Sequence, residues 1–224
     1  MIANPPRGKF ITFEGGEGAG KTTQITRLAD RLHSRGITSI TTREPGGAPG
    51  ADSIRSLLVS GATDKWDPVS EVLLLYAARR EHLKQTILPA LDQGVWVLCD
   101  RFADSTMAYQ GYGHGISKEF IRGLHAEVVG DADPDLTLIL DIPVEIGIGR
   151  AVSRNTSARS GEDRFERMDT SFHERLRAGF LDIAAGSPER VRVIDADSTP
   201  EAVTEAVWQT VTDNFDLNPP AAPA

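Results

Sequence analysis

Short apolar runs alternate with longer stretches of helical periodicity along most of the chain. Five runs of five or six residues are largely apolar without alternation, and they lie at 9–14, 37–42, 95–100, 136–141 and 191–195. Continuous apolar runs are typical of strands buried on both faces of a sheet. Helix-length segments occur at 21–35, 69–92, 118–129, 167–185 and 200–214. The alternation predicts an α/β fold with a five-stranded parallel sheet flanked by helices on both faces.

The polar ends of the predicted strands indicate where a ligand binds. In parallel sheets, ligands lie outside the carboxyl ends of the strands, which share one edge. The five ends here carry Glu14, Arg43, Asp100, Asp141 and Asp195. We therefore expect a site for a charged ligand at this edge.

No linker divides the chain into separate units. Its 224 residues suffice for one α/β domain with a full core. We expect a single domain over 1–224, with the core at about 9–214. The ends at 1–8 and 216–224 are expected to be frayed, and the second of these is rich in Pro and Ala.

A glycine-rich segment follows the first predicted strand and opens the first predicted helix. It fits G-x-x-x-x-G-K-[ST], a loop whose backbone N–H groups surround the phosphates of a nucleoside triphosphate. Lys21 is expected to reach the β- and γ-phosphates, and Thr22 to ligate Mg²⁺. The expected nucleotide-binding residues are Gly15, Gly16, Glu17, Gly18, Ala19, Gly20, Lys21, Thr22 and Thr23.

Charge and composition narrow the class of partner. The net charge of −8 argues against non-specific nucleic-acid binding, which needs a basic face. No apolar run approaches the roughly 18 residues of a membrane span, and the first residues lack the apolar core of a signal peptide. The single cysteine, Cys99, allows no intrachain disulfide and fits a reducing compartment. We expect a cytoplasmic protein with no nucleic-acid or membrane partner.

A GTP-dependent switch is a rival interpretation of the glycine-rich loop. Such a protein would need a D-x-x-G that senses the γ-phosphate and an N-K-x-D that reads guanine. The chain contains no D-x-x-G, and its nearest approach to N-K-x-D is DKWD at 64–67, with Asp in place of Asn. The sequence therefore disfavours the switch.

A kinase for a second phosphorylated molecule needs cations from several places, because two anionic phosphates must lie close together. Arg43 ends the second predicted strand in TTREPGG, and Asp100 and Arg101 come at the end of the third. Asp100 is expected to approach Mg²⁺ together with Thr22. The guanidinium of Arg101 can bridge the donor and acceptor phosphates.

An arginine-rich segment at 149–167 is a predicted lid. Its arginines alternate with Ser, Asn and Gly, and Arg150 and Arg154 are four residues apart, so that they share a helix face. Such a segment is expected to close over the transferring phosphoryl group. A solvated hinge neutralised by its own acidic residues is the alternative. The lid arginines are Arg150, Arg154, Arg159, Arg164 and Arg167.

The long middle helix offers a base-binding pair. Tyr76 precedes Arg79 by three residues, which places both on one helical face. An aromatic ring can stack on a base while an arginine donates to a ring carbonyl. A core position for Tyr76 is an equally good interpretation.

Four segments in order, FEGGEGAGKTTQ, TREPGG, YAAR and DRFADSTMAYQG, together resemble bacterial thymidylate kinase, and the resemblance runs from about residue 9 to 211. It implies a P-loop nucleoside monophosphate kinase fold that uses ATP and Mg²⁺. The implied reaction is the phosphorylation of dTMP to dTDP in the biosynthesis of dTTP, de novo and by salvage. The family is typically homodimeric, so a homodimer is expected.

The resemblance also implies roles for individual residues. Lys21 would hold the ATP phosphates, and Glu17 would be an acidic group near the 3′-hydroxyl and phosphate of dTMP. Arg43, assisted by Arg55, would bind the dTMP phosphate, and Arg101 would clamp the transferring phosphoryl group. The residues implied around the base and sugar are Tyr76, Arg79, Ser105, Thr106, Tyr109 and Gln110.

Two positions depart from patterns within the family. Gly18 stands where eukaryotic members carry an arginine, so the chain resembles the subgroup that supplies its catalytic arginine from the lid. Arg154 is the first choice for that role, with Arg150 and Arg164 behind it. Leu75 stands where many members carry a phenylalanine, which leaves open whether Tyr76 stacks on the base.

Three questions stay open at the level of the sequence. Another nucleoside monophosphate kinase, for UMP, CMP or AMP, would share most of these features. A nucleotide-binding regulatory protein without phosphoryl transfer is the alternative from another class. The residues that contact adenine are not located, and the segment at 194–198 is a candidate by resemblance alone.

Overall fold

A five-stranded parallel sheet forms the centre of the computed structural model, which describes residues 6–155, 164–165 and 167–217. The strand order is β2-β3-β1-β4-β5 and every pairing is parallel, which confirms the predicted sheet. Four of the five predicted strands have the predicted last residue, and β2 ends one residue later. The strands are β1 (Phe10–Glu14), β2 (Ser39–Arg43), β3 (Trp96–Asp100), β4 (Leu136–Asp141) and β5 (Val191–Asp195).

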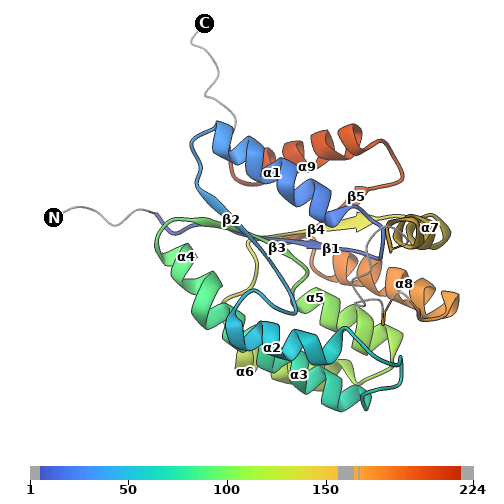
Figure 1. Cartoon of the computed structure of the whole chain (residues 1–224). Helices are drawn as coiled ribbons and strands as arrows, with labels where there is room; N and C mark the ends of the chain where they lie inside the picture. Colours follow the sequence, from blue (N-terminus) through green and yellow to red (C-terminus); the bar gives the residue numbers. More distant parts are fainter. Residues whose placement is uncertain (1–5, 156–163, 166, 218–224) are drawn as a thin grey trace, which may run out of the picture.

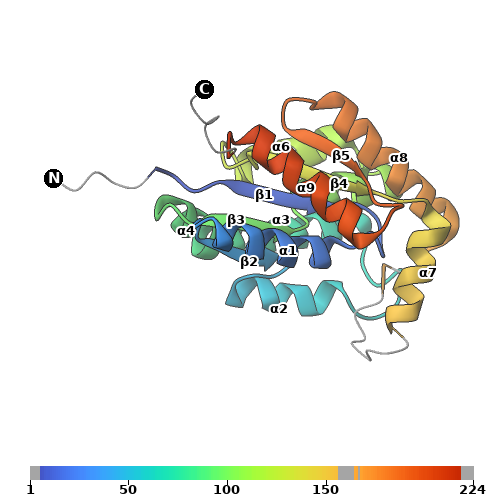
Figure 2. The same ribbon diagram turned by 90° about the horizontal axis from the view of Figure 1, so that it is seen from above.

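Helices cover both faces of the sheet, and α7 lies beside the carboxyl ends of the strands (Figures 1 and 2). Helices α1 and α9 pack on one face, where Leu28 and Val207 belong to the same core cluster as β1 and β4. The other helices that cover the sheet pack on the opposite face. The α-helices are α1 (Lys21–Ser34), α2 (Pro49–Leu58), α3 (Pro68–His82), α4 (Leu88–Asp92), α5 (Ala103–Thr106), α6 (Lys118–Val128), α7 (Val144–Asn155), α8 (Thr170–Gly186) and α9 (Pro200–Asn214).

Strand β1 is the middle of the core. All five of its residues are buried, since it is paired on both sides and covered on both faces. Its last residue, Glu14, is buried as well, at the sheet edge where the sequence predicts a ligand. A carboxylate without any exposed surface at this place needs hydrogen-bond partners, and these are described with the site below.

Four helical regions differ from the prediction, and one of them is α7, which lies outside the predicted helix-length segments. The sequence does not predict helix α2, because its first residues, Pro and Gly, are typical of a turn; it forms against α3, where Ala51 and Ala78 pack closely. Residues 103–113 are not predicted to be helical either, since they are rich in Ser, Thr and Gly, yet they form α5 and a π-helical turn packed on α8. The expected helix at 69–92 is α3 and α4 joined by a π-helical turn.

Each predicted frayed end includes a residue that forms a backbone hydrogen bond in the described part of the chain. The N–H of Gly8 donates to the carbonyl of Leu91 at 2.8 Å, and that of Leu217 donates to Thr212 at 3.1 Å. Residues 1–5 and 218–224 of those ends lie outside the described residues, as do 156–163 and 166 of the predicted lid. Among the described helices, none is long and apolar enough to span a membrane.

Candidate active site

A cavity of about 1120 Å³ opens at the carboxyl ends of β1, β2 and β3, as the strand ends predict. The glycine-rich loop forms one end of the cavity, and residues of α3, α5 and the following π-helical turn form the other. Most of the predicted nucleotide and substrate residues line it. They include Glu17, Lys21, Thr22, Arg43, Arg55, Arg79, Asp100, Arg101, Ser105, Thr106, Tyr109 and Gln110.

The glycine-rich loop has the geometry of a phosphate-binding loop. Gly20 has φ 92° and precedes the first turn of α1, a conformation that glycine adopts at little cost. The ammonium of Lys21 donates to the carbonyls of Gly15 and Gly16 at 3.2 and 2.9 Å. Burial, and then the charge of Arg101, lower the pKa of Lys21 to about 8. An anionic phosphate in the loop would therefore stabilise the charged form of Lys21.

Thr22 and Asp100, the two residues predicted to bind Mg²⁺, contact each other in the structure. The Thr22 hydroxyl donates to Oδ2 of Asp100 at 2.9 Å, across 78 residues of sequence. Hydroxyl and carboxylate oxygens are hard donors, and Mg²⁺ in nucleotide sites commonly uses one or two of them besides phosphate oxygens and waters. No group of three His, Cys, Asp or Glu side chains gathers in the described part of the chain. The donor set thus fits a Mg²⁺ ion that arrives with the nucleotide.

Arg101 occupies a strained position between the loop and the acceptor end of the cavity. Its φ of 68° lies in the left-handed region, which costs a non-glycine residue about 1–3 kcal/mol and often marks a functional site. Nη1 donates to the carbonyl of Gly15 at 3.0 Å and to Ser105 at 3.2 Å, and Nη2 donates to Glu17 at 2.8 Å. The guanidinium is therefore directed at the phosphate loop.

Glu17 joins Arg101 to the predicted sugar site. The Tyr109 hydroxyl donates to the same oxygen, Oε1 of Glu17, at 2.7 Å. Burial is the main cause that raises the pKa of Tyr109, so its hydroxyl remains a donor. The guanidinium of Arg101 also lies 5.0 Å from the centre of the Tyr109 ring. Glu17 thus faces the cavity, as expected of an acid on the substrate side.

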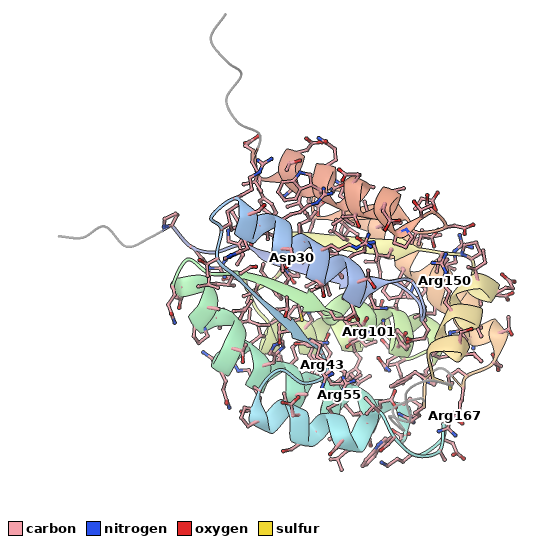
Figure 3. The ribbon with its side chains drawn as sticks, turned by 45° about the horizontal axis from the view of Figure 1, so that its top comes forward. Asp30, Arg43, Arg55, Arg101, Arg150 and Arg167 are labelled. Carbon is pink, nitrogen blue, oxygen red and sulfur yellow. The ribbon has the colours of Figure 1, made fainter. Side chains whose placement is uncertain are left out.

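Arg43 and Arg55 supply positive charge opposite the glycine-rich loop. Both line the cavity, and Figure 3 shows them close to Arg101. Nη1 of Arg55 donates to the carbonyl of Pro45 at 2.7 Å, which ties α2 to the loop after β2. Arg43 is exposed to the cavity from the end of β2. Three guanidinium groups from separate elements thus converge, as a site for an anionic substrate requires.

The base-reading candidate Arg79 is almost fully buried, with 2% of its surface exposed. Its Nε donates to Glu44 at 2.8 Å, and Nη2 donates to the Phe102 carbonyl at 3.1 Å and the Thr106 hydroxyl at 2.9 Å. Nη1 is buried and has no hydrogen-bond partner among the described residues. The NH₂ group of Nη1 is therefore left without a described partner on a fixed guanidinium whose residue lines the cavity.

Gln110 supplies a hydrogen-bond acceptor at the same end of the cavity as Arg79. Its Nε2 donates to Glu71 at 2.7 Å, while Oε1 is buried and has no hydrogen-bond partner within the described ranges. Gln110 lines the cavity and is 1% exposed. The base end therefore presents one unused donor, on Arg79, and one unused acceptor, on Gln110.

Tyr76 does not line the cavity, so the structure does not support stacking of its ring on the base. Residues 75 and 79 are four apart on α3 and face the cavity, whereas Tyr76 is turned toward the core. Its hydroxyl donates to the Ile121 carbonyl at 3.3 Å, and the guanidinium of Arg79 lies 4.6 Å from its ring centre. Tyr76 thus supports Arg79, and Leu75 forms the cavity wall.

The three lid candidates have different positions. Nη1 of Arg150 donates to the carbonyl of Ala196 at 3.4 Å, and Ala196 belongs to the segment 194–198, the candidate for contact with adenine. Arg164 is 2% exposed and is ion-paired with Glu71 below the base end, which removes it from the phosphates. The side chain of Arg154 lies outside the described residues.

Supporting carboxylates are the site residues that sequence reasoning missed. Glu14 accepts from the Phe102 N–H at 2.7 Å and from the Ser105 hydroxyl, which fixes the turn around Arg101. Burial, and then the charge of Asp104, raise the pKa of Glu14 to about 7. Glu44 holds both Arg79 and Nδ1 of His82, at 2.8 and 3.0 Å. The sequence signal that could have identified Glu14 is a charged residue at the last position of a buried strand.

Comparison with known proteins agrees with this geometry. A family model described as Thymidylate kinase matches residues 13–207. The thymidylate kinase of Caulobacter vibrioides is 56% identical over 211 residues, covering 94% of this chain and 99% of the relative. That of Afipia carboxidovorans is 52% identical over 209 residues, covering 93% and 91%. The crystal structure of thymidylate kinase from Ehrlichia chaffeensis matches with a TM-score of 0.72 at 36% identity, covering 92% of this chain and 100% of that one. The chain therefore belongs to the thymidylate kinase family.

Proposed function

We propose that the cavity brings ATP and dTMP together and that Arg101 binds the phosphoryl group as it passes between them. The thymidylate kinase family phosphorylates dTMP to dTDP, and this chain is an enzyme of that family. The glycine-rich loop receives the donor phosphates. Arg79 and Gln110 receive the base of the acceptor at the other end of the cavity.

The observation that carries the proposal is the pair of unused polar atoms at the base end. Nη1 of Arg79 is a buried donor and Oε1 of Gln110 a buried acceptor, and neither has a partner among the described residues. A buried polar atom without a partner costs about 1–3 kcal/mol, so a ligand that satisfies both is favoured. Thymine offers O4 as an acceptor beside N3–H as a donor, whereas cytosine offers the reverse. The pair therefore supports a thymine-type base.

The acceptor phosphate would lie among Arg43, Arg55 and Arg101, which line one part of the cavity. A phosphate monoester has its second pKa near 6, so its attacking oxygen is largely deprotonated at neutral pH and needs no strong general base. This oxygen attacks the γ-phosphorus of ATP in line, and the bond to the β-phosphate oxygen breaks. The arginines act by positioning and charge neutralisation.

Glu17 and Tyr109 keep Arg101 directed at the loop, because both bond within one network on the cavity wall. Lys21 would exchange the carbonyls of Gly15 and Gly16 for phosphate oxygens. Thr22 and Asp100 are the residues that would hold Mg²⁺. When bound, the ion neutralises phosphate charge and stabilises the leaving group.

A further cation from the lid completes this proposal, with Arg154 as the first choice. A Cβ at Gly18 would lie 2.1 Å from the Gly147 carbonyl oxygen, and Gly18 has φ +69°, so the loop has no space for an arginine at this position. The Cβ of Arg150 lies beside Gly18 of the loop, but its guanidinium donates to the Ala196 carbonyl, toward the segment proposed to contact adenine. Arg164 is engaged by Glu71. These placements support the lid as the source.

A panel of monophosphates tests the substrate. We expect ADP release in the order dTMP, then dUMP, with dCMP and AMP far behind, because only the first two present O4 beside N3–H. A preference for a purine monophosphate would contradict the proposal. ATP binding without ADP release for any monophosphate would instead indicate a regulatory protein.

A cytoplasmic homodimer remains part of the proposal. The nucleotide substrates support the location. The apolar side chains of Val69 and Leu73 on α3 and Phe120 on the contacting helix α6 are exposed, at 41, 49 and 39%. A second subunit covering them would remove apolar surface from water. Light scattering after size-exclusion chromatography would show a mass of twice the 24.2 kDa chain.

A further inference from the structure

A buried carboxylate behind the base end determines which end of the Gln110 amide faces the cavity. Glu71, in the first turn of α3, is 1% exposed. Its Oε1 accepts from Nε2 of Gln110 at 2.7 Å, and its Oε2 accepts from Nη1 of Arg164. Both oxygens of Glu71 are therefore occupied by donors.

Arg164 fixes Glu71 as an acceptor. The guanidinium is 2% exposed and also donates to the carbonyls of Leu58 and Ala62, at 3.2 and 3.0 Å. Arginine has only donors and keeps its charge in proteins, so an ion-paired Glu71 has no proton to offer the amide. Gln110 must then turn its NH₂ group toward Glu71. Its Oε1 is left for the cavity, and this is the atom without a partner among the described residues.

We propose that Glu71 is a specificity-determining positioning residue, which holds Gln110 as an acceptor for the N3–H of the base and thereby disfavours cytosine. The inference rests on the proposed function, since it needs a pyrimidine at this end of the cavity. A thymine base donates from N3 to Oε1 of Gln110. A cytosine base presents an unprotonated N3, so that two acceptors would face each other in a buried place.

The variant Glu71→Gln tests the proposal, because an uncharged amide can donate or accept and lets Gln110 turn over. The ratio of kcat/KM for dTMP to that for dCMP should fall about ten- to a hundredfold, through a higher KM for dTMP and better use of dCMP. The KM for ATP should not change. The ratio should not invert, because Nη1 of Arg79 still opposes the 4-amino group of cytosine.

Val207→Ala is the matched control for loosened packing. Val207 on α9 is 1% exposed and packs in the core on the face of the sheet opposite to α3. Its truncation should therefore lower the stability of the fold without changing contacts at the base end of the cavity. This variant should keep the dTMP to dCMP ratio of the wild type. A purely structural role of Glu71 would make Glu71→Gln behave in the same way.

If Glu71→Gln does not fold, the double variant Glu71→Gln with Gln110→Glu tests the same proposal. The amide introduced on α3 then donates to the carboxylate introduced on the π-helical turn. The second oxygen of that carboxylate stays an acceptor for the base, so dTMP should remain preferred over dCMP.

A folded Glu71→Gln enzyme that keeps the wild-type ratio of kcat/KM for dTMP to that for dCMP within about threefold would overturn the inference. A double variant that prefers dCMP over dTMP would also overturn the inference. A wild-type enzyme that does not prefer dTMP would instead refute the proposed function.

Discussion

Glu44 binds Arg79 through Nε alone and so leaves Nη1 of that arginine without a partner among the described residues. The Nε–Oε2 distance is 2.8 Å, and both side chains are at most 4% exposed. The other oxygen of Glu44 bonds to Nδ1 of His82, whose Nε2 lies 2.7 Å from the Thr42 hydroxyl. Glu44 thus links Arg79, the proposed base-reading arginine, to the end of β2, where Arg43 lines the cavity.

Replacing Glu44 with Gln should weaken the binding of dTMP more than that of ATP. The neutral amide holds Arg79 less firmly, so the KM for dTMP should rise roughly tenfold while the KM for ATP stays constant. Loss of a buried charge partner should also cost about 3 kcal/mol of unfolding free energy. Steady-state kinetics in each substrate and urea titration measure the two effects.

Arg80→Gln is the control for this prediction. Arg80 is the exposed neighbour of Arg79 on α3 and donates to the Val128 carbonyl, away from the cavity. Its replacement should leave both KM values unchanged. Equal changes in the KM of dTMP and ATP in Glu44→Gln would show that Glu44 acts on the fold as a whole.

Replacing Arg101 with Ala should separate catalysis from nucleotide binding. The guanidinium contacts Gly15 and Glu17, but the N–H groups and Lys21 of the loop remain for ATP. We expect kcat to fall about a thousandfold, because charge on the transferring phosphoryl group loses its bidentate partner. Binding of ATP, measured by calorimetry, should change only a few-fold.

Arg101→Lys is the matched variant, since it keeps the charge and the left-handed backbone but lacks the planar fork. It should recover only a small part of the lost kcat. Near-normal turnover in Arg101→Ala would exclude Arg101 from the transfer step.

The strands and the phosphate loop could be predicted because local rules determine them. A strand buried on both faces is mostly apolar without alternation, as β1 and β4 show, and the loop before α1 needs glycine at positive φ whatever the rest of the chain does. The order of charged residues at the strand ends then located the cavity. These features depend on a few neighbouring residues.

The support of the site could not be predicted because it depends on distant contacts. Glu14 meets Phe102 across 88 residues, Glu71 meets Arg164 across 93, and α2 forms only where α3 offers a surface. The side chain of Tyr76 favours stacking on chemical grounds, yet the phase of α3 turns Leu75 to the cavity instead. The type of a residue does not show which face of its helix is turned toward the cavity.

Replacing Asp100 with Asn should raise the Mg²⁺ concentration needed for activity. The amide removes the negative charge beside Thr22, so half-maximal activity should require roughly tenfold more Mg²⁺ at fixed ATP. Thr22→Ser keeps the hydroxyl and should resemble the wild type, whereas Thr22→Ala should resemble Asp100→Asn. An unchanged Mg²⁺ titration in Asp100→Asn would place the ion elsewhere.

Glu14 should make the stability of the fold depend on pH. Burial, and then the charge of Asp104, raise its pKa to about 7, above the value of 4.5 for an unperturbed glutamate. The folded state therefore binds an extra proton between these values, and the stabilisation is complete below pH 4.5 and lost as the pH rises through 7. Between about pH 5 and about pH 8 this group should account for a loss of roughly 2 kcal/mol.

Glu14→Gln should flatten that dependence, because the amide keeps an acceptor for the Phe102 N–H and carries no charge at any pH. Urea unfolding at about pH 5 and about pH 8 should show a smaller loss in the variant than in the wild type. Glu127→Gln removes an exposed carboxylate on α6 and serves as the matched control, since this side chain lies in water and outside the core. If Glu14→Gln and the wild type lost the same free energy of unfolding over this range, Glu14 would be ionised throughout. A buried negative charge would then stabilise the strained turn at Arg101.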